Sequence, residues 1–361
     1  MLCAPKLDPD VPTVAVENRF AALFAGRPVI LAPMEEVTDA LFRRICRRLG
    51  AELCVTEFVN VEGLLRGCKK AARKVGLGPG DEPTAIQIYG ADVGRLIEAA
   101  RVAEQAAPAF IDINCGCWVP KIARRGAGSG WLRAPDAMVE MVAAVVRAVA
   151  LPVTVKTRIG WGDESEMPIV ALSRRLEQVG VRALTIHCRT AKAGLRGAAD
   201  WGWARLVAEA VRIPVVLNGD VRTADDARRA FATTGAAGVM VGRRAIEHPW
   251  IFREARSLLD HGAACPDPTV AERFELCREH LRAMAEARGE PYGIRAVRRH
   301  LGGYIAGLRG AAELRRRLFS CDTLTGSIAI LDEAEPMMRA WHERARDSAE
   351  AVAPAVPAIT T

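Results

Sequence analysis

Short apolar runs rich in β-branched residues recur through the first 245 residues of the chain, and each is followed by a polar turn and a helical stretch. There are eight of these runs, and nearly all of their central residues are apolar. Strands that are apolar on both faces are typical of a parallel sheet covered by helices, and eight successive βα units close into a barrel. The sequence therefore predicts an α/β fold, a (β/α)8 TIM barrel, with strands at 29–33, 53–57, 84–90, 110–114, 152–158, 183–187, 213–219 and 237–243.

Amphipathic stretches between the strands predict the outer helices, at 38–49, 92–106, 135–149, 166–179, 203–212 and 223–234. The β pattern ends after about residue 255, where Pro266 and Pro268 mark a linker and an Arg-rich helical sequence begins. The chain is therefore predicted to have a barrel domain over residues 1–255, a smaller all-helical domain over 265–345 and a flexible tail over 346–361.

Every predicted strand ends in a residue that can hold a ligand. This matters because catalytic groups in such barrels come from the C-terminal strand ends and the loops after them. A single Gln or His at a strand end is ordinarily a hydrogen-bonded structural group, but eight such ends in register indicate one site. In strand order they are Met34, Glu57, Gln87, Asn114 with Cys117, Lys156 with Arg158, His187 with Arg189, Asn218 with Asp220, and Gly242 with Arg243.

The last two strands carry the sequences NGD at 218–220 and GRR at 242–244. Their glycines allow backbone N–H groups to approach an anion, and barrels commonly bind phosphate after strands seven and eight. A phosphorylated cofactor or substrate is one interpretation, and tight turns without a ligand are the other. The segment GAGSG at 126–130 is interpreted as a turn entering the next helix, because no strand leads directly into it and no GK[ST] follows.

Composition narrows the class of protein. The ten cysteines and six histidines are scattered, with no CxxC pair and no finger spacing, so we expect no bound metal. We expect no leader peptide and no membrane span, since no apolar run approaches the roughly 20 residues that cross a bilayer, and hence a cytoplasmic protein with reduced thiols. A net charge of +7 and a pI near 9.0 favour an anionic partner.

An ordered set of motifs at the strand ends resembles a known family. The motifs are LAPM-x-x-VTD (31–39), TEF (56–58), QIYG (87–90), DIN-x-GC (112–117), VKTRIGW (155–161), IH-x-RT (186–190), NGD (218–220), VGR (241–243) and R-x-x-RRH (295–300). From about Leu31 to about Leu308, the chain resembles the bacterial tRNA-dihydrouridine synthases, which are FMN-dependent barrels with a C-terminal helical domain.

This resemblance implies roles for the matching residues, with Cys117 as the catalytic proton donor. The FMN would be held by Pro33, Met34, Gln87, Lys156, His187, Asn218, Gly219, Asp220, Gly242 and Arg243. The uridine and the tRNA around it would be contacted by Glu57, Asn114, Arg158, Arg189, Arg295, Arg298, Arg299 and His300. NADPH or NADH would be the reductant, tRNA would be the partner, and we expect a monomer.

The implied reaction suits a neutral thiol. The C5=C6 bond of uracil is conjugated to the C4 carbonyl, so hydride from reduced flavin at C6 leaves negative charge toward C5 and O4, and a proton must reach C5. A thiol with a pKa of about 8.5 is mostly protonated at neutral pH and can donate that proton. Cys117 therefore fits a general acid better than the alternative, an inert buried cysteine, because it lies on a Gly-containing loop after a strand.

The Arg-rich segment bears on the partner. Residues 273–317 contain eleven arginines and five glutamates, a net charge of +6. A solvated helix face would explain this run by itself, but beside a barrel that resembles a uridine-reducing enzyme an RNA-docking surface is favoured. The target base must leave its stack to react, which favours a flexible RNA loop over a helix.

Three residues depart from the family pattern: Trp118 stands where the family usually has Pro, and Cys188 and Glu36 stand where it has Gly. The tryptophan could reshape the loop that carries Cys117, or its ring could offer a stacking surface for RNA. The motifs also mix two branches of the family, which leaves the target uridine open.

Two other functions stay open. Another FMN barrel oxidoreductase, such as a dihydroorotate dehydrogenase, would act on a free pyrimidine, but it has no evident need for an Arg-rich helical domain. A catalytically silent RNA-binding protein is the second alternative, and Trp118 is the main reason to consider it. Flavin absorbance after purification would separate an enzyme from a binder.

Overall fold

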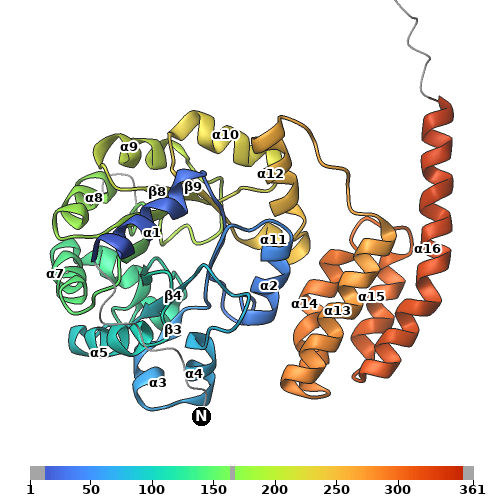
Figure 1. The fold of residues 1–361 in the computed structure, drawn as a ribbon, viewed down its shortest axis with the longest axis horizontal. Helices are drawn as coiled ribbons and strands as arrows, with labels where there is room; N and C mark the ends of the chain where they lie inside the picture. The colour runs from blue at the N-terminus through green and yellow to red at the C-terminus, as the bar shows by residue number, and fades with distance from the viewer. Residues whose placement is uncertain (1–12, 163–166, 353–361) are drawn as a thin grey trace, which may run out of the picture. The chain divides into compact units, whose positions relative to one another are not determined.

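The computed structural model describes residues 13–162 and 167–352, and within it eight parallel strands close into a barrel (Figure 1). Strand β1 pairs with both β2 and β9, and pairing between β2 and β4 completes the ring. The predicted TIM barrel is confirmed. Its strands are β1 (Val29–Leu31), β2 (Leu53–Val55), β4 (Thr84–Tyr89), β5 (Ile111–Cys115), β6 (Val153–Arg158), β7 (Ala183–His187), β8 (Val215–Asn218) and β9 (Gly238–Val241).

Amphipathic helices form a ring around these strands (Figure 1). The six predicted outer helices are present within a few residues of their expected bounds, as α2 (Ala40–Arg48), α5 (Val93–Glu104), α7 (Pro135–Val146), α8 (Ile169–Gln178), α9 (Gly202–Ala210) and α10 (Ala224–Thr234). Side-chain hydrogen bonds cap the N-termini of several of these helices. At α2, Asp39 accepts a hydrogen bond from the Phe42 N–H at 3.0 Å, and at α10, Thr223 forms a capping box with Asp226.

Several short elements have no counterpart in the prediction. Between β2 and β4 lie β3 (Val59–Asn60), α3 (Val61–Leu65) and α4 (Lys69–Val75). The others are α1 (Thr13–Ala25), α6 (Pro120–Ala123), α11 (Arg243–Glu247) and α12 (Ile251–His261). Most of them are too short to show a hydrophobic period in the sequence.

The core at the N-terminal end of the barrel is closed by α1. Phe20 and Phe24 from this helix belong to one cluster with inward residues of the strands, and Phe20 packs edge-on against Phe110 at 5.5 Å between ring centroids. Only a void of about 10 Å³ remains inside. The barrel is therefore a packed core, and ligands can be held only at its other end.

The contacts divide the chain into two compact units. The barrel unit runs to residue 245 and resumes at 249–265, while the second unit comprises 246–248 and the chain from 266 onward. The second unit is helical, with α13 (Val270–Arg288), α14 (Tyr292–Tyr304), α15 (Ala311–Ser320) and α16 (Leu324–Val352). Its core holds Phe274, Leu281 and Leu301.

The predicted tail at 346–361 lies largely outside the described residues. Helix α16 continues to Val352, and residues 353–361 are not described. Among the helices of the described ranges, none is long and apolar enough to cross a bilayer.

A buried ion pair fixes the loop before β4 against α2. Arg43 and Asp81 are both 2% exposed at their side chains and form a bidentate pair through one edge of the guanidinium, with Nε to Oδ1 at 2.7 Å and Nη2 to Oδ2. Arg43 also donates from Nη1 to the Thr38 carbonyl at 2.9 Å. Such a pair adds little over an apolar contact, but removing one partner leaves a buried charge without compensation.

We therefore predict that Asp81→Ala lowers the free energy of unfolding by about 3–5 kcal/mol. Asp225→Ala is the matched control, because the Arg228–Asp225 pair is 57% and 53% exposed and its loss costs under about 1 kcal/mol. Urea unfolding of both variants followed by far-UV circular dichroism measures the difference. Equal midpoints for the two variants would contradict the structural role given to Asp81.

Candidate active site

Polar side chains occupy the inward positions at the C-terminal end of the barrel. Side chains alternate along a strand, so on β6 the inward positions are Thr154, Lys156 and Arg158. The register sets Asn114 beside Lys156 and His187 beside Asn218 on neighbouring strands. The predicted strand-end residues of the barrel therefore converge on one rim.

Cys117 lies two residues beyond β5, on a loop held by Asn114. The Asn114 Oδ1 accepts hydrogen bonds from the N–H groups of Gly116 at 3.1 Å and Cys117 at 2.8 Å. The Ser129 N–H donates to the Cys117 carbonyl at 3.0 Å, and a Cβ built at Gly128 would lie 2.8 Å from that oxygen. The segment GAGSG thus packs on the Cys117 loop, and leads through the 3-10 helix at Gly128–Arg133 toward α7, as predicted.

Asn114 is itself oriented by a chain of buried side chains. Its Nδ2 donates to Gln87 Oε1 at 2.8 Å, and Gln87 Nε2 donates to Asp112 Oδ2. Thr154 donates to the other Asp112 oxygen. Burial raises the pKa of Asp112, while these two hydrogen bonds lower it. The position of the Cys117 loop therefore depends on a carboxylate that the sequence analysis did not single out.

Arg158 ties the loop after β5 to the loop after β7. It is 2% exposed, and it donates from Nε to the Gly116 carbonyl at 2.8 Å. Its Nη1 donates to the carbonyls of Thr190 and Gly194 at 2.9 and 2.8 Å. Within the described residues no hydrogen bond is found from Nη2, so this end of the guanidinium stays open to a substrate oxygen.

Positive charge gathers at the ends of β6, β7 and β9. Lys156 donates to Asn218 Oδ1 at 3.0 Å, and burial followed by Arg158 lowers the pKa of Lys156 to about 8. Burial and the cations around it, Arg158 first, hold the pKa of His187 well below its usual range. The cations at these strand ends are complementary to an anion.

Asp220 is the acid that organises this charge. Its Oδ2 pairs with Arg189, and its Oδ1 lies 3.3 Å from Arg222 Nη2 and 3.2 Å from Arg243 Nη2. Its own backbone has φ +54°, in the left-handed region. Predicted as a cofactor ligand, Asp220 is placed to orient these arginines, since a carboxylate repels phosphate.

The two predicted glycine ligands differ in their surroundings. Gly219 has φ +120°, and a Cβ there would lie 2.9 Å from the Ala199 Cβ. At Gly242 a Cβ would meet Ala32 and Met34 at 3.7 and 3.9 Å, which is ordinary van der Waals contact, and the glycine itself is half-buried. A half-buried glycine backbone beside Arg243 and Lys156 fits a phosphorylated cofactor, as the NGD and GRR sequences predict.

The ends of β1 and β2 form a second polar cluster. Glu57 is buried, accepts the Glu36 N–H at 2.6 Å and lies 3.4 Å from Lys74 Nζ, which also pairs with Glu35. Pro33 and Met34 follow β1 directly, and the Met34 carbonyl accepts the N–H of Thr38 at 3.0 Å. Lys74 and Glu35 were missed because neither lies on a predicted strand end.

Arg189 is predicted to contact RNA, but its side chain faces inward. It is 3% exposed, and its guanidinium donates to Asp220 and, at 2.7 Å, to the Gly197 carbonyl. The buried Arg189 side chain therefore supports the residues at the rim of the site.

The predicted RNA residues of the second unit have mixed surroundings. Arg295 and Arg298 both pair with Asp322. Arg299 is exposed, whereas His300 is 3% exposed and packs against His280 at 4.8 Å between ring centroids. Of these residues, His300 lies in the core of its unit, where it can support α14 but presents no surface to RNA.

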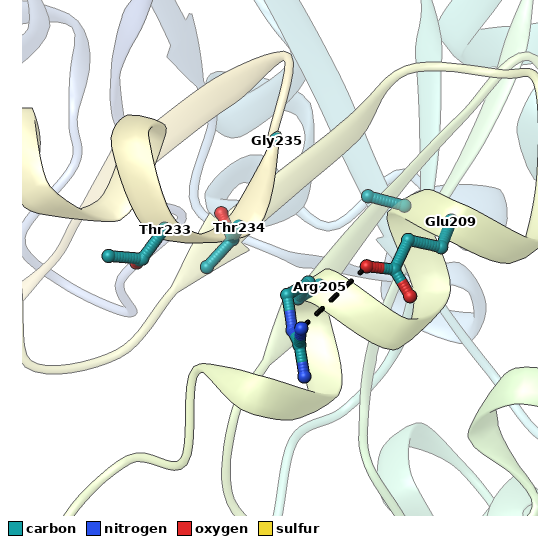
Figure 2. Close-up of a pocket in the computed structure, with 6 residues that line it drawn as sticks. Arg205, Glu209, Thr233, Thr234 and Gly235 are labelled. Carbon is teal, nitrogen blue, oxygen red and sulfur yellow. Dashed lines mark ion pairs between the residues drawn. The ribbon is translucent and has the colours of Figure 1, made fainter.

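An open pocket elsewhere on the barrel has no chemistry of this kind. Figure 2 shows Arg205 and Glu209 of α9 opposite Thr233, Thr234 and Gly235 at the end of α10. Its volume is about 250 Å³, and its charged pair is 3.9 Å apart and exposed.

Among the described residues no group of His, Cys, Asp and Glu could hold a metal ion.

The amino-acid sequence of this chain matches a known protein family. The family model for Dihydrouridine synthase (Dus) matches residues 30–340. The chain belongs to the dihydrouridine synthase family. Membership in this enzyme family confirms the resemblance predicted from the strand-end motifs.

The chain is similar in sequence to several relatives over most of their length and most of its own. It is 38% identical over 303 residues to tRNA-dihydrouridine synthase B of Pseudomonas aeruginosa, covering 83% of this chain and 91% of the relative. It is 36% identical over 307 residues to a probable tRNA-dihydrouridine synthase 1 of Synechocystis sp., covering 85% and 86%. A probable tRNA-dihydrouridine synthase of Rhodobacter capsulatus is 38% identical over 314 residues, covering 85% and 94%.

The structure gives reasons for two departures of this family member from the usual pattern. Glu36 has φ +58°, a conformation that glycine adopts without strain, and its carboxylate pairs with Lys70 at 2.8 Å. Cys188 is 1% exposed, and burial raises the pKa of its thiol to about 12, so it stays a neutral, unreactive group.

Cys117 is protonated at neutral pH in this environment. Partial burial raises the pKa of its thiol, while a Val119 backbone hydrogen bond and the charges of Arg158 and Lys156 lower it. Cys68 is the opposite case, because hydrogen bonds from the backbone of Ala71 and Lys70 lower the pKa of an exposed thiol. The first is suited to donating a proton and the second to reacting as a thiolate.

We predict that iodoacetamide at pH 7.5 labels Cys68 at least about tenfold faster than Cys117, since the thiolate is the reactive form. Labelling of Cys117 should accelerate as the pH rises above 7.5, because its raised pKa shifts formation of the thiolate to more alkaline pH. Mass spectrometry of tryptic peptides over time measures both rates, with the fully buried Cys277 as the unlabelled control. Equal rates for Cys68 and Cys117 at pH 7.5 would show that Cys117 is not held as a neutral thiol.

Proposed function

We propose that this chain reduces uridines in tRNA to 5,6-dihydrouridine, with FMN as cofactor, NADPH or NADH as reductant and Cys117 as the proton donor. The observation that carries this proposal is one barrel rim that combines a neutral thiol with a cation-rich phosphate cradle. The family supports the reaction, and the chain's own geometry supports the roles given to its residues.

The residues at the ends of β6 to β9 fit the cofactor. The phosphate would lie against the half-buried backbone of Gly242 and the charge of Arg243, while Lys156 and Gln87 would contact the ring system and ribityl chain. His187, Asn218 and Gly219 would complete the enclosure, and Pro33 and Met34 would lie along its side. When bound, the flavin supplies the hydride that uracil receives at C6.

The protein's own contribution is the proton. The Cys117 thiol gives its proton to C5, where the negative charge develops, and becomes a thiolate. That thiolate is stabilised by the Val119 backbone hydrogen bond and by the charges of Arg158 and Lys156. Arg158 Nη2 is the open donor that would orient a uracil carbonyl oxygen, and Asn114 would act mainly by fixing the loop of Cys117.

The partner, location and state complete the proposal. The tRNA would be held by cations around the barrel rim and by exposed arginines of the helical unit, such as Arg299. A cytoplasmic location and a monomeric state stay predictions from the sequence.

Replacing the acid provides the direct test. We predict that Cys117→Ala retains FMN and NADPH-dependent flavin reduction but forms dihydrouridine at least about 100-fold more slowly, the usual contribution of general acid catalysis. Mass spectrometry of digested tRNA after single-turnover reaction with the reduced holoenzyme gives the rate. Cys68→Ala is the control and should behave as wild type, because Cys68 is an exposed thiol at the N-cap of α4 and does not lie at a strand end of the barrel. Dihydrouridine formation at the wild-type rate in Cys117→Ala would remove the acid role.

The helical unit generates a second prediction. Arg299→Glu should weaken tRNA binding and lower the slope of log Kd against log salt concentration by about 1, since one phosphate contact is lost. Arg228→Glu is the control, because Arg228 is an exposed arginine on α10 of the barrel unit and makes the same change of charge outside the helical unit. Fluorescence anisotropy with labelled tRNA from 50 to 300 mM KCl, with flavin absorbance as a check on folding, measures both. An unchanged slope for Arg299→Glu would contradict RNA docking at this position.

A further inference from the structure

The third departure from the family pattern, Trp118, presents an indole ring directly beside Cys117. Trp118 is 40% exposed, whereas tryptophan side chains are on average highly buried. A Cβ built at Gly194 would lie 3.1–3.3 Å from three atoms of the six-membered part of the ring. The ring therefore packs on the glycine backbone on one side and stays accessible to solvent elsewhere.

The support beneath this ring is rigid. Gly194 has φ +62°, and its carbonyl accepts a hydrogen bond from the buried Arg158 at 2.8 Å. The same Arg158 holds the Gly116 carbonyl, two residues before Trp118. The ring is thus fixed between the loops after β5 and β7, so little side-chain entropy is lost when a ligand packs against it.

The surroundings of the ring are apolar at the centre and basic at the edge. Val119 and Leu195 are 41% and 43% exposed and follow Trp118 and Gly194 in the chain. Segments 115–134 and 188–199 contain seven lysines and arginines and no aspartate or glutamate. Within the described ranges no ion pair is found for the six exposed members of this set, which are Lys121, Arg124, Arg125, Arg133, Lys192 and Arg196, whereas the seventh, Arg189, is buried and pairs with Asp220.

This combination matches one class of ligand. A flat aromatic ring surrounded by cations without acids is the arrangement that binds single-stranded nucleic acid, through base stacking and phosphate contacts. An acidic protein surface would pair with the cations, but its carboxylates would not stack on the exposed indole face.

We propose that Trp118 is a stacking platform for an unpaired nucleobase of the substrate RNA, next to the uridine that enters the site. This inference rests on the proposed action on tRNA. It assigns Trp118 a role in holding the RNA loop, and it distinguishes this chain from family members with proline at the same position.

The test compares Trp118→Ala, Trp118→Phe and Leu195→Ala in the flavin-loaded protein, with an unmodified tRNA transcript as the probe. Loss of one stacked base should raise the Kd about tenfold in Trp118→Ala. Trp118→Phe should stay within about threefold of wild type because it keeps an aromatic face, and Leu195→Ala within about twofold because it removes only apolar area. Since no phosphate contact is lost, the salt slope of Trp118→Ala should equal that of wild type.

A spectroscopic readout accompanies the binding measurement. Adding the transcript should quench tryptophan fluorescence in wild type by more than in Trp118→Phe, because a stacked base quenches the indole directly. An unchanged Kd in Trp118→Ala, or a Kd for Trp118→Phe as weak as that of Trp118→Ala, would overturn the stacking role. If wild type instead shows the quenching but forms no dihydrouridine, the proposed function fails and the stacking platform stands.

Discussion

The site depends on a single buried carboxylate. Asp112 lies inside the barrel, where an acid without partners would be far too costly to keep charged, and its oxygens are taken by Thr154 and Gln87. Because the Nε2 of Gln87 faces Asp112, its carbonyl oxygen faces Asn114, and the carbonyl oxygen of Asn114 in turn faces the Cys117 loop. Each amide is fixed by its neighbour, so the thiol is positioned by a chain that begins in the core.

The rim of the barrel, next to this series of hydrogen-bonded side chains, carries positive charge that the protein's own acids do not neutralise. Lys156 and His187 both have pKa values lowered by burial and by neighbouring cations, and Asp220 already pairs with three arginines. An anionic ligand would relieve this repulsion, so the folded state is prepared for one before it binds. The charges of Arg158 and Lys156 would also stabilise a thiolate at Cys117.

Charge counted along the sequence was a poorer guide than charge in the structure. The net +6 of residues 273–317, beside the barrel, favoured an RNA-docking surface over a solvated helix face. The acids that follow in the chain fold back onto it: Arg278 pairs with Asp332 and Glu335, and Arg317 with Glu333. A window of sequence cannot include partners from α16, so the number of arginines available to RNA is smaller than the count implied.

By itself the sequence determined the eight strands, the outer helices and the ordered strand-end residues, because hydrophobic periodicity and chain order are local properties. It also made Cys117 a candidate, since a cysteine on a Gly-containing loop after a buried strand is visible in the letters alone. Only the tertiary structure decided which polar groups face the rim and which are buried as supports. Asp112, Arg189 and Gly128 act through contacts with residues between 11 and 42 positions away in the chain, and such contacts exist only once the barrel has closed.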